Sequence, residues 1–231
     1  MLILRIVGII FQNEARFEMK KATQKEIAAI KALFLEHYPT AVTELKYTSL
    51  YELLVCVMLS AQCTDKRVNL ITPALFERYP TVKALSNANL DDIKSFISSC
   101  SFFNNKAVNL LKMAQKVVEL YDGEIPLDEK KLMGLAGVGQ KTAHVVMIEY
   151  ANANLMAVDT HVYRVAHRLG LSSAKTAIKT EEDLTRIFKS ELHTLHQAMV
   201  LFGRYTCKAV HPLCEACFLK AYCKTTQSFK V

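Results

Sequence analysis

Apolar residues recur at helical spacing along most of the chain. Ile27, Ile30, Leu33 and Phe34 fall on one side of a helix, because residues three and four positions apart share a face. Strand-like alternation is not sustained anywhere beyond the first residues. The pattern predicts an all-α protein. Further helices are expected over residues 90–97, 106–120, 142–150, 162–169 and 181–201.

Two helix starts carry a local signature. Thr23 with Glu26, and Ser49 with Glu52, have the spacing of a capping box, and an apolar stretch follows each pair. The five prolines are expected at or between helices, where a missing N–H does least harm. The chain contains no internal repeat and no low-complexity linker.

The first eleven residues are apolar apart from Arg5. The stretch is too short to span a bilayer, and it lacks the small-residue cleavage site of a secretory signal. We interpret residues 1–18 as an extension outside the core, or as translation from an upstream start codon. The alternative is a strand or helix that packs on the body.

Charge and composition narrow the class of partner. About half of the 231 residues are hydrophobic, which is enough for a substantial core. The 29 Lys and Arg residues exceed the 22 Asp and Glu residues by 7. This excess favours a polyanionic partner, with nucleic acid ahead of a membrane surface. Many basic proteins bind no nucleic acid, so the charge alone does not decide the matter.

The seven cysteines form two sets. Cys56, Cys63 and Cys100 lie in helical segments, as expected of buried thiols. The other four have the pattern C-x6-C-x2-C-x5-C, which without a secretory context indicates a metal site. Only one pair has zinc-knuckle spacing, and the common ferredoxin spacings do not match either. The spacing favours an iron–sulfur cluster and leaves zinc open. The four are Cys207, Cys214, Cys217 and Cys223.

The cysteine segment is also basic. From residue 204 onward five Lys and Arg residues face one acidic residue, Glu215. The cations are expected either to contact DNA phosphates or to balance the negative charge of a thiolate-bound cluster, and both can hold.

Residues 135–141 read LAGVGQK and join two predicted helices. Gly137 and Gly139 permit positive φ and leave backbone N–H groups open. Together with the start of the next helix, these groups form an anion pocket suited to a DNA phosphate. Val138 is expected to anchor the turn in the core. The alternative is an ordinary turn between helices.

Lys141 and Asp159 are the candidate reactive groups. An ammonium at a helix N-terminus meets an unfavourable dipole, and partial burial adds a desolvation penalty. A neutral Lys141 amine could form a Schiff base with a sugar carbon, with the Asp159 carboxylate accepting its proton. The alternatives are a solvated lysine on a phosphate and an aspartate that caps the helix after it.

Several stretches resemble the endonuclease III family of helix-hairpin-helix (HhH-GPD) DNA glycosylases. The resemblance spans roughly residue 25 to the C-terminus, and the order and spacing of its motifs are specific. One departure is Ala136, where the family usually has proline. The matching stretches are residues 59–65, 123–126, 135–143, 158–161 and 203–207, together with the four-cysteine loop.

The resemblance implies roles for individual residues. Lys141 falls on the catalytic lysine and Asp159 on the catalytic aspartate, and the four cysteines fall on the ligands of a 4Fe-4S cluster. Gln62 matches a glutamine that fills the gap left by an extruded nucleotide. Phe102 falls where the family places an apolar wedge, often leucine. The residues assigned to DNA contact are Gln62, Phe102, Gly137, Val138, Gly139 and His161.

An architecture and an activity are implied as well. Residues 43–153 would form a six-helix barrel domain with the hairpin, and residues 19–42 and 154–231 a second domain with the cluster loop. A cleft between them would hold Lys141 and Asp159. The implied enzyme is a bifunctional DNA glycosylase and AP lyase of base excision repair. It would remove oxidised pyrimidines from duplex DNA and cut 3′ to the abasic site by β-elimination.

The expected form is a monomer that acts in the cytoplasm at the nucleoid, without a membrane. Three other classes stay open. An adenine-mismatch glycosylase of the same superfamily typically lacks the lysine and carries a large C-terminal domain, whereas this chain ends eight residues after Cys223. The others are a non-catalytic DNA-binding protein with a structural cluster, and an electron-transfer protein.

Overall fold

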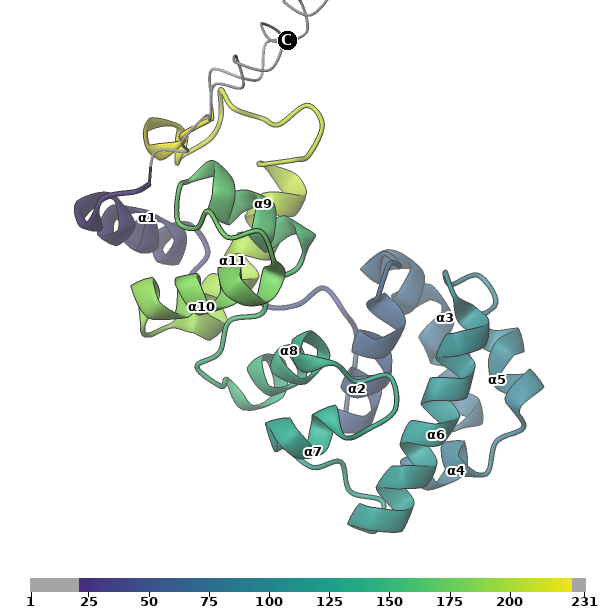
Figure 1. Ribbon diagram of the computed structural model, residues 1–231. Coiled ribbons are helices and arrows are strands. Elements are labelled where there is room, and N and C mark those ends of the chain that lie inside the picture. Colours follow the sequence, from purple (N-terminus) through teal and green to yellow (C-terminus); the bar gives the residue numbers. More distant parts are fainter. Residues whose placement is uncertain (1–20, 226–231) are drawn as a thin grey trace, which may run out of the picture.

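The computed structural model describes residues 21–225, and Figure 1 shows them as helices in two groups. No strand occurs in this range, which confirms the all-α class. The proposed extension over residues 1–18 lies outside the described residues. The helices are α1 (Gln24–His37), α2 (Leu50–Ser60), α3 (Asp65–Arg78), α4 (Val82–Ser86), α5 (Leu90–Ile97), α6 (Phe103–Tyr121), α7 (Glu129–Met133), α8 (Gln140–Ala151), α9 (Thr160–Arg168), α10 (Ala177–Phe188), α11 (Leu192–Tyr205) and the 3-10 helix η1 (Lys220–Tyr222).

Helices α2 to α8 share one hydrophobic core. Helix α2 is apolar on nearly all sides and packs against α3, α6 and α8, so it is buried at the centre of this group. Fully buried side chains such as Leu53, Leu59 and Leu110 each contribute roughly 1.5–3 kcal/mol. The group contains seven helices where six were expected, and two of these, α4 and α7, have five residues each.

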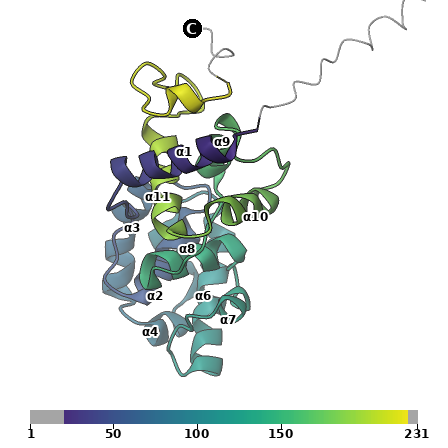
Figure 2. The ribbon, with the colours of Figure 1, turned by 90° about the vertical axis from the view of Figure 1, so that its left-hand side faces the viewer.

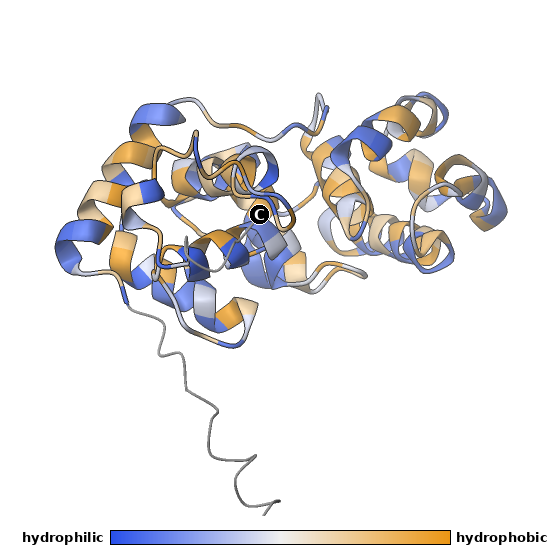
Figure 3. Cartoon of the chain, turned by 90° about the horizontal axis from the view of Figure 1, so that it is seen from above, coloured by the Kyte–Doolittle hydropathy of each residue, from blue (hydrophilic) through white to orange (hydrophobic). Residues whose placement is uncertain are grey.

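Helix α1 packs with α9, α10 and α11 around a second core. The Phe34 and Phe202 rings meet edge to face with centroids 5.4 Å apart, and Phe218 of the cysteine loop lies 5.1 Å from Phe202. The cysteine loop therefore packs on this group, at the end away from α2 to α8 in Figures 1 and 2. Most helices of both groups carry hydrophobic and hydrophilic residues together (Figure 3). Within residues 21–225 no helix has the length and apolarity to cross a membrane.

Both expected helix caps are present. The Thr23 side chain accepts a hydrogen bond from the Glu26 amide, and the Glu26 carboxylate accepts one from the Thr23 amide at 2.7 Å. Ser49 accepts from the Glu52 amide, but the Glu52 carboxylate accepts from Thr48 instead of Ser49. In the second capping box, the carboxylate therefore bonds to the amide one residue before the N-cap.

The single helix expected over residues 181–201 is wrong, because α10 and α11 are separate. Lys189 and Glu191 have φ of 66° and 60°, which ends one helix and begins the next. The break is stabilised from elsewhere in the chain. The Lys31 ammonium donates to the carbonyl of Ser190 at 3.0 Å, and the Asn154 side chain accepts from the first amide of α11 at 3.0 Å. The spacing of apolar residues within the segment does not indicate contacts with Lys31 or Asn154.

Helix α3 contains Pro73, so the expectation that prolines fall at or between helices is wrong there. A proline inside a helix removes one hydrogen bond and costs about 3 kcal/mol. The burial of Val68 and Leu75, both with no exposed surface, offsets that cost. The helix starts at a normal cap, where the Thr64 hydroxyl accepts from the Arg67 amide.

Candidate active site and cluster loop

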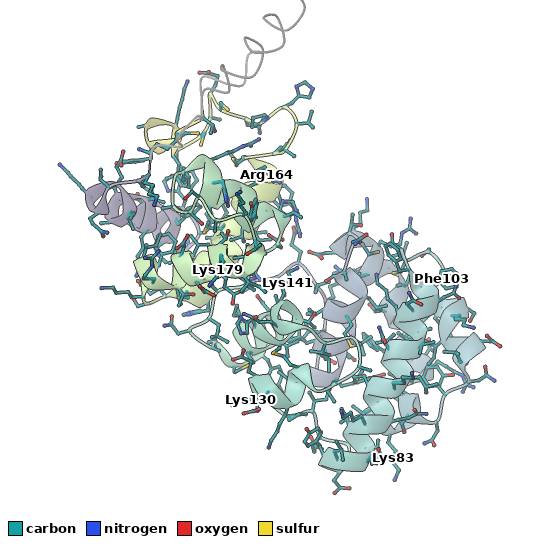
Figure 4. All side chains as sticks on the ribbon, viewed as in Figure 1. Lys83, Phe103, Lys130, Lys141, Arg164 and Lys179 are labelled. Atoms are coloured by element: carbon teal, nitrogen blue, oxygen red, sulfur yellow. The ribbon has the colours of Figure 1, made fainter. Side chains whose placement is uncertain are left out.

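Lys141 and Asp159 line the same pocket from opposite groups of helices. Lys141 is the second residue of α8, and Asp159 precedes α9 as its N-cap. The pocket has a volume of about 70 Å³ and opens beside a wider groove that both residues also line. Figure 4 shows Lys141 at the junction of the two groups. The structure therefore brings the two candidate reactive groups together.

The Lys141 side chain is exposed, so the partial burial expected from the sequence is wrong. It forms no ion pair or hydrogen bond with Asp159 in the part of the chain that the structure describes. The amine lies at a helix start, where its flexible stem can reach across the pocket. A substrate atom can therefore enter between the amine and the carboxylate.

Asp159 is half-buried and caps α9. Its Oδ1 accepts a hydrogen bond from the Val162 amide at 2.8 Å, so the capping interpretation is correct. A cap uses one oxygen and fixes the rotamer of the carboxylate. The second oxygen has no hydrogen-bond partner within residues 21–225. Capping and reaction with a proton are thus compatible at this side chain.

His196 of α11 lines this pocket as well, and sequence reasoning missed it. Its side chain is buried, with 2% exposed, and Nδ1 lies 2.8 Å from the carbonyl oxygen of Ala157. Burial lowers the pKa of His196 to about 4, with the charge of Lys141 acting in the same direction and that of Asp159 opposing it. His196 is therefore a neutral imidazole at physiological pH. A histidine within an apolar helix looks like a core residue, so no local signal marks it.

The glycine turn before α8 depends on only one of its glycines. Gly137 has φ of 76°, and a Cβ there would lie 2.8 Å from Cβ of Asn109. Gly139 has φ of −91° and open space around it, so its backbone does not use the positive φ that a glycine permits. Val138 is buried, as expected, and its amide donates to Leu135 at 3.2 Å. The turn closes with Ala136 in place.

The start of α8 presents unpaired backbone donors. The first N–H groups of a helix have no partner within it. Gly139 at the N-cap has no side chain, so the approach to these donors is open. The arrangement is what an anion such as a phosphate requires.

Gln62 and Phe102 are both exposed and both have left-handed backbone, with φ of 54° and 58°. This conformation is unfavourable for residues other than glycine, and it tends to occur at functional positions. The Phe102 side chain is 62% exposed, so its ring is accessible to DNA. Gln62 lines the groove that leads to Lys141.

His161 faces the same groove from α9. Its Nδ1 lies 3.1 Å from Nη2 of Arg164. A guanidinium can only donate, so Nδ1 accepts and Nε2 carries the proton. The ring therefore offers an N–H donor toward the groove, as a contact to DNA requires.

The four cysteines of the loop line one small cavity of about 20 Å³. Within residues 21–225 no group of His, Cys, Asp or Glu side chains converges closely enough to hold a single metal ion. Four thiolates are the ligand set that a 4Fe-4S cluster requires. Burial raises the pKa of the Cys217 thiol, and the other three cysteines raise it further. Four such thiolates require a cationic centre.

Two arginines donate hydrogen bonds to Cys207. The Arg168 guanidinium donates to Sγ of Cys207 at 3.3 Å, and Arg164 donates to the Cys207 carbonyl at 2.9 Å. Both arginines lie on α9, the helix that Asp159 caps. The loop is therefore fastened to the element that positions the candidate carboxylate.

Two family models match the chain. The HhH-GPD superfamily of base excision DNA repair proteins matches residues 55–190, and the iron-sulfur binding domain of endonuclease III matches residues 207–223. Endonuclease III of Haemophilus influenzae is 40% identical over 190 residues, covering 82% of this chain and 90% of the relative. Endonuclease III of Synechocystis is 41% identical over 214 residues, covering 90% and 97%. The chain belongs to the endonuclease III family.

Solved structures of endonuclease III agree. A trapped endonuclease III–DNA covalent intermediate has a TM-score of 0.84 and 39% identity, covering 87% of this chain and 96% of that one. A non-covalent endonuclease III–DNA complex has a TM-score of 0.83 and 38% identity, covering 87% and 95%. The chain is thus a DNA glycosylase and AP lyase of base excision repair, and its cofactor is a 4Fe-4S cluster, as the sequence predicted.

Proposed function

We propose that Lys141 is the nucleophile and Asp159 its proton acceptor in the removal of oxidised pyrimidines from duplex DNA. One observation carries the proposal. An exposed amine and a half-buried carboxylate line one pocket from two groups of helices, with no ion pair between them. Such an arrangement leaves room for a sugar carbon between the two groups.

DNA binding would use the surfaces around this pocket. The donors at the start of α8 and the N–H of His161 suit phosphates of the damaged strand. Phe102 would wedge into the base stack, and Gln62 would occupy the gap left by the extruded nucleotide. The damaged pyrimidine would then enter the groove beside Lys141.

Base removal follows from the two side chains. The second oxygen of Asp159 takes a proton from the Lys141 ammonium, which frees the lone pair on Nζ. Nζ forms a bond to C1′ of the deoxyribose, and the glycosidic bond breaks with its electron pair moving to the base. The departing base takes the proton from Asp159, and the restored carboxylate stabilises the positive charge on the sugar. His196, being neutral, adds no competing charge beneath the pair.

Strand cleavage uses the product of that step. Opening of the sugar ring gives an iminium, a protonated Schiff base, between Nζ and C1′, and this makes the C2′ hydrogen acidic. Loss of that proton breaks the C3′–O bond, so the 3′ phosphate leaves with the electron pair. Water then hydrolyses the imine and restores the lysine. The cut lies 3′ to the abasic site.

The 4Fe-4S cluster would be held by Cys207, Cys214, Cys217 and Cys223. It supplies four metal–sulfur bonds that fold the loop, and none of the proposed steps passes through it. Lys208 of the loop would reach DNA phosphates, whereas Lys220 and Lys224 pair with Glu215 and Glu26. We further propose that the enzyme acts as a monomer in the cytoplasm at the nucleoid, without a membrane partner.

Borohydride trapping tests the assignment of Lys141. Reduction of the imine in a reaction with a thymine-glycol duplex should give a covalent enzyme–DNA adduct, and Lys141→Ala should give none. Lys130→Ala changes an exposed lysine of α7 and serves as the matched control, with trapping as in the wild type. Equal trapping by wild type and Lys141→Ala would show that the nucleophile is another group.

A further inference from the structure

A polar contact ties the helix of Lys141 to the opposite group of helices. Nε2 of Gln140 donates to Oε1 of Glu181 at 2.9 Å, and Nδ1 of His144 lies 2.9 Å from the same oxygen. Gln140 and His144 belong to α8, whereas Glu181 belongs to α10. The Glu181 side chain is only 12% exposed, so little water competes for its oxygens. We call these three residues the Glu181 clasp.

His144 has a carboxylate on each side. Its Nε2 lies 3.1 Å from Oε1 of Glu129 on α7, and its side chain is 7% exposed. Glu181 first, and Glu129 after it, raise the pKa of His144 to about 9 against the effect of burial. His196 of α11, near Glu181, is neutral. An imidazolium between two carboxylates therefore closes the clasp at neutral pH.

The clasp lies beside both candidate reactive residues in the chain. Gln140 immediately precedes Lys141, and His144 follows it by three positions, which places it one turn along the same helix. Nδ1 of His144 also lies 3.3 Å from the carbonyl of Met156, three residues before Asp159. Helix α8 packs mainly on α2 and α7, and α10 packs on α9. The clasp is therefore a local tie between the segments that carry the amine and the carboxylate.

We propose that Glu181 is a positioning residue, which sets the start of α8 against α9 and α10 and thereby the approach of Lys141 to Asp159. The inference rests on the roles proposed above for those two residues. Glu181 does not touch the substrate in this scheme. A displacement of about 1 Å between reacting groups can lower a rate about a hundredfold. Loss of the clasp should therefore slow the chemical step much more than it weakens DNA binding, because Gln62, Phe102 and His161 would bind DNA independently of it.

Two variants separate positioning from folding. Glu181→Ala removes the clasp, and Glu181→Gln keeps its size but cannot pair with an imidazolium. The matched control is Glu182→Gln on the same helix, because Glu182 is exposed and pairs only with Lys179 one turn away. Single-turnover cleavage of an abasic-site duplex reports the rate. Affinity for a tetrahydrofuran duplex, which cannot form a Schiff base, reports binding.

We expect Glu181→Ala to lower the single-turnover rate roughly ten- to a hundredfold with less than about a threefold change in affinity. Glu181→Gln should fall between Glu181→Ala and the wild type, and Glu182→Gln should match the wild type. A Gln140→Ala, Glu181→Ala double variant should lose less than the product of the single losses, because the two side chains share one contact. An unchanged rate in Glu181→Ala, or equal losses of rate and affinity, would overturn the proposal.

The same assays test the role of Lys141 separately from the role of Glu181. If Lys141→Ala cleaves the abasic duplex like the wild type, the proposed function itself fails. If Lys141→Ala is inactive while Glu181→Ala cleaves normally, only the positioning role fails. Helical circular dichroism and the visible absorbance of the cluster verify that each variant is folded.

Two thiols lie close together in the loops that carry Gln62 and Phe102. Sγ of Cys63 lies 3.4 Å from Sγ of Cys100, within reach of an S–H···S hydrogen bond, and no disulfide joins them. Cys63 follows Gln62 directly, and Cys100 lies two residues before Phe102. Cys63 is half-buried and lines the groove, whereas Cys100 is buried. The two loops with left-handed residues therefore meet at this thiol pair.

We infer that Cys63 and Cys100 form a modification site for hydrogen peroxide. The Cys63 thiolate attacks one peroxide oxygen, so that an S–O bond forms, the O–O bond breaks and hydroxide leaves. The Cys100 sulfur, as its thiol proton leaves, attacks the Cys63 sulfenic acid, and a second hydroxide leaves. In sum, two thiols and one peroxide give a disulfide and two waters. The groove gives access to Cys63, so it reacts first.

The disulfide would fix the loops of Gln62 and Phe102 to each other. A linked pair of loops cannot adjust separately as Gln62 and Phe102 enter DNA, so oxidation should weaken binding. Burial raises the pKa of Cys100 to about 11, while Lys106 and Arg67 act in the opposite direction. The second step should therefore be slower than the first and should speed up with rising pH.

Peptide mass spectrometry after mild peroxide treatment tests this site. We expect a Cys63–Cys100 linked peptide, a severalfold loss of affinity for a tetrahydrofuran duplex, and recovery with dithiothreitol. Cys63→Ser and Cys100→Ser should resist the reversible loss, whereas Cys56→Ser, in the buried core, should behave as wild type. Cluster absorbance is followed so that samples with a damaged cluster are discarded. Oxidation of Cys63 without the linked peptide, or a linked peptide with unchanged affinity, would overturn the inference.

Discussion

Alkaline pH should weaken the folded protein through His144. Its pKa is about 9 in the folded chain and 6.5 as the ordinary value, so folding favours the protonated ring. A raised pKa contributes stability that is fully present below about pH 6.5 and is lost as pH rises through about 9. The interval between 6.5 and about 9 corresponds to about 3 kcal/mol of unfolding free energy, taken as an upper limit.

Urea unfolding of the wild type and His144→Gln measures this contribution. Glutamine keeps a polar side chain but cannot carry the charge. Followed by circular dichroism under anaerobic conditions, the difference in unfolding free energy should be largest near about pH 6 and should fall toward zero near about pH 10. Comparing the two proteins at each pH cancels groups that titrate equally in both. A difference that stays constant with pH, or grows, would refute the reasoning.

The carboxylates around His144 provide an internal check on that result. Glu181 contributes most to the raised pKa of His144, and Glu129 contributes less. Glu181→Gln should therefore remove more of the pH dependence than Glu129→Gln. The reverse order would mean that the imidazolium is stabilised mainly from α7, and the tie between the two groups of helices would then be weak.

Three further predictions follow from single contacts. Gly137→Ala should lower the unfolding free energy in the same urea assay by about 1–2 kcal/mol from its left-handed backbone, plus the clash with Asn109. Gly139→Ala has open space but replaces the N-cap of α8, and it should cost roughly 0.5–1 kcal/mol. Lys106→Met should cost about 1–3 kcal/mol in urea unfolding, because two carbonyls at the end of α2 lose the ammonium donor at 2.7 Å. Cys217→Ser should lower the iron content measured by colorimetric assay and raise protease cleavage of the loop, since four thiols line the cluster cavity.

The positions of most helices were predictable because their causes are local. The helix over Leu90–Ile97 has the bounds that its apolar spacing predicted, and Thr23 caps α1 as its signature indicated. The break between α10 and α11 was not predictable. Its stabilising partners, Lys31 and Asn154, lie more than 30 residues away, so no window on the segment contains them. A helix that contains Pro73 was missed for a related reason, since tertiary burial outweighs the local penalty.

The residues of the candidate site also differ in whether their positions depend on local sequence or on distant contacts. Lys141 and Asp159 each sit at a helix start, and helix starts are marked by residues close in sequence. His196 and Glu181 reach the pocket or its helix from elements 55 and 40 residues after Lys141. Their roles depend on burial and on partners across the fold, so a sequence shows only a histidine in an apolar run and one acid among several. The sequence therefore predicted Lys141 and Asp159, but it did not predict His196 or Glu181.

The environment of Lys141 differs from the one that its sequence predicted. Burial was expected to favour a neutral amine, yet the side chain is exposed. A reactive amine must then come from groups that act once DNA covers the pocket: the free oxygen of Asp159 and the exclusion of water by the sugar and base. Before DNA arrives, the fold can only hold the start of α8 in register with α9. The nearly buried Glu181 is placed for that task, which is why a residue with no contact to Lys141 should control its rate.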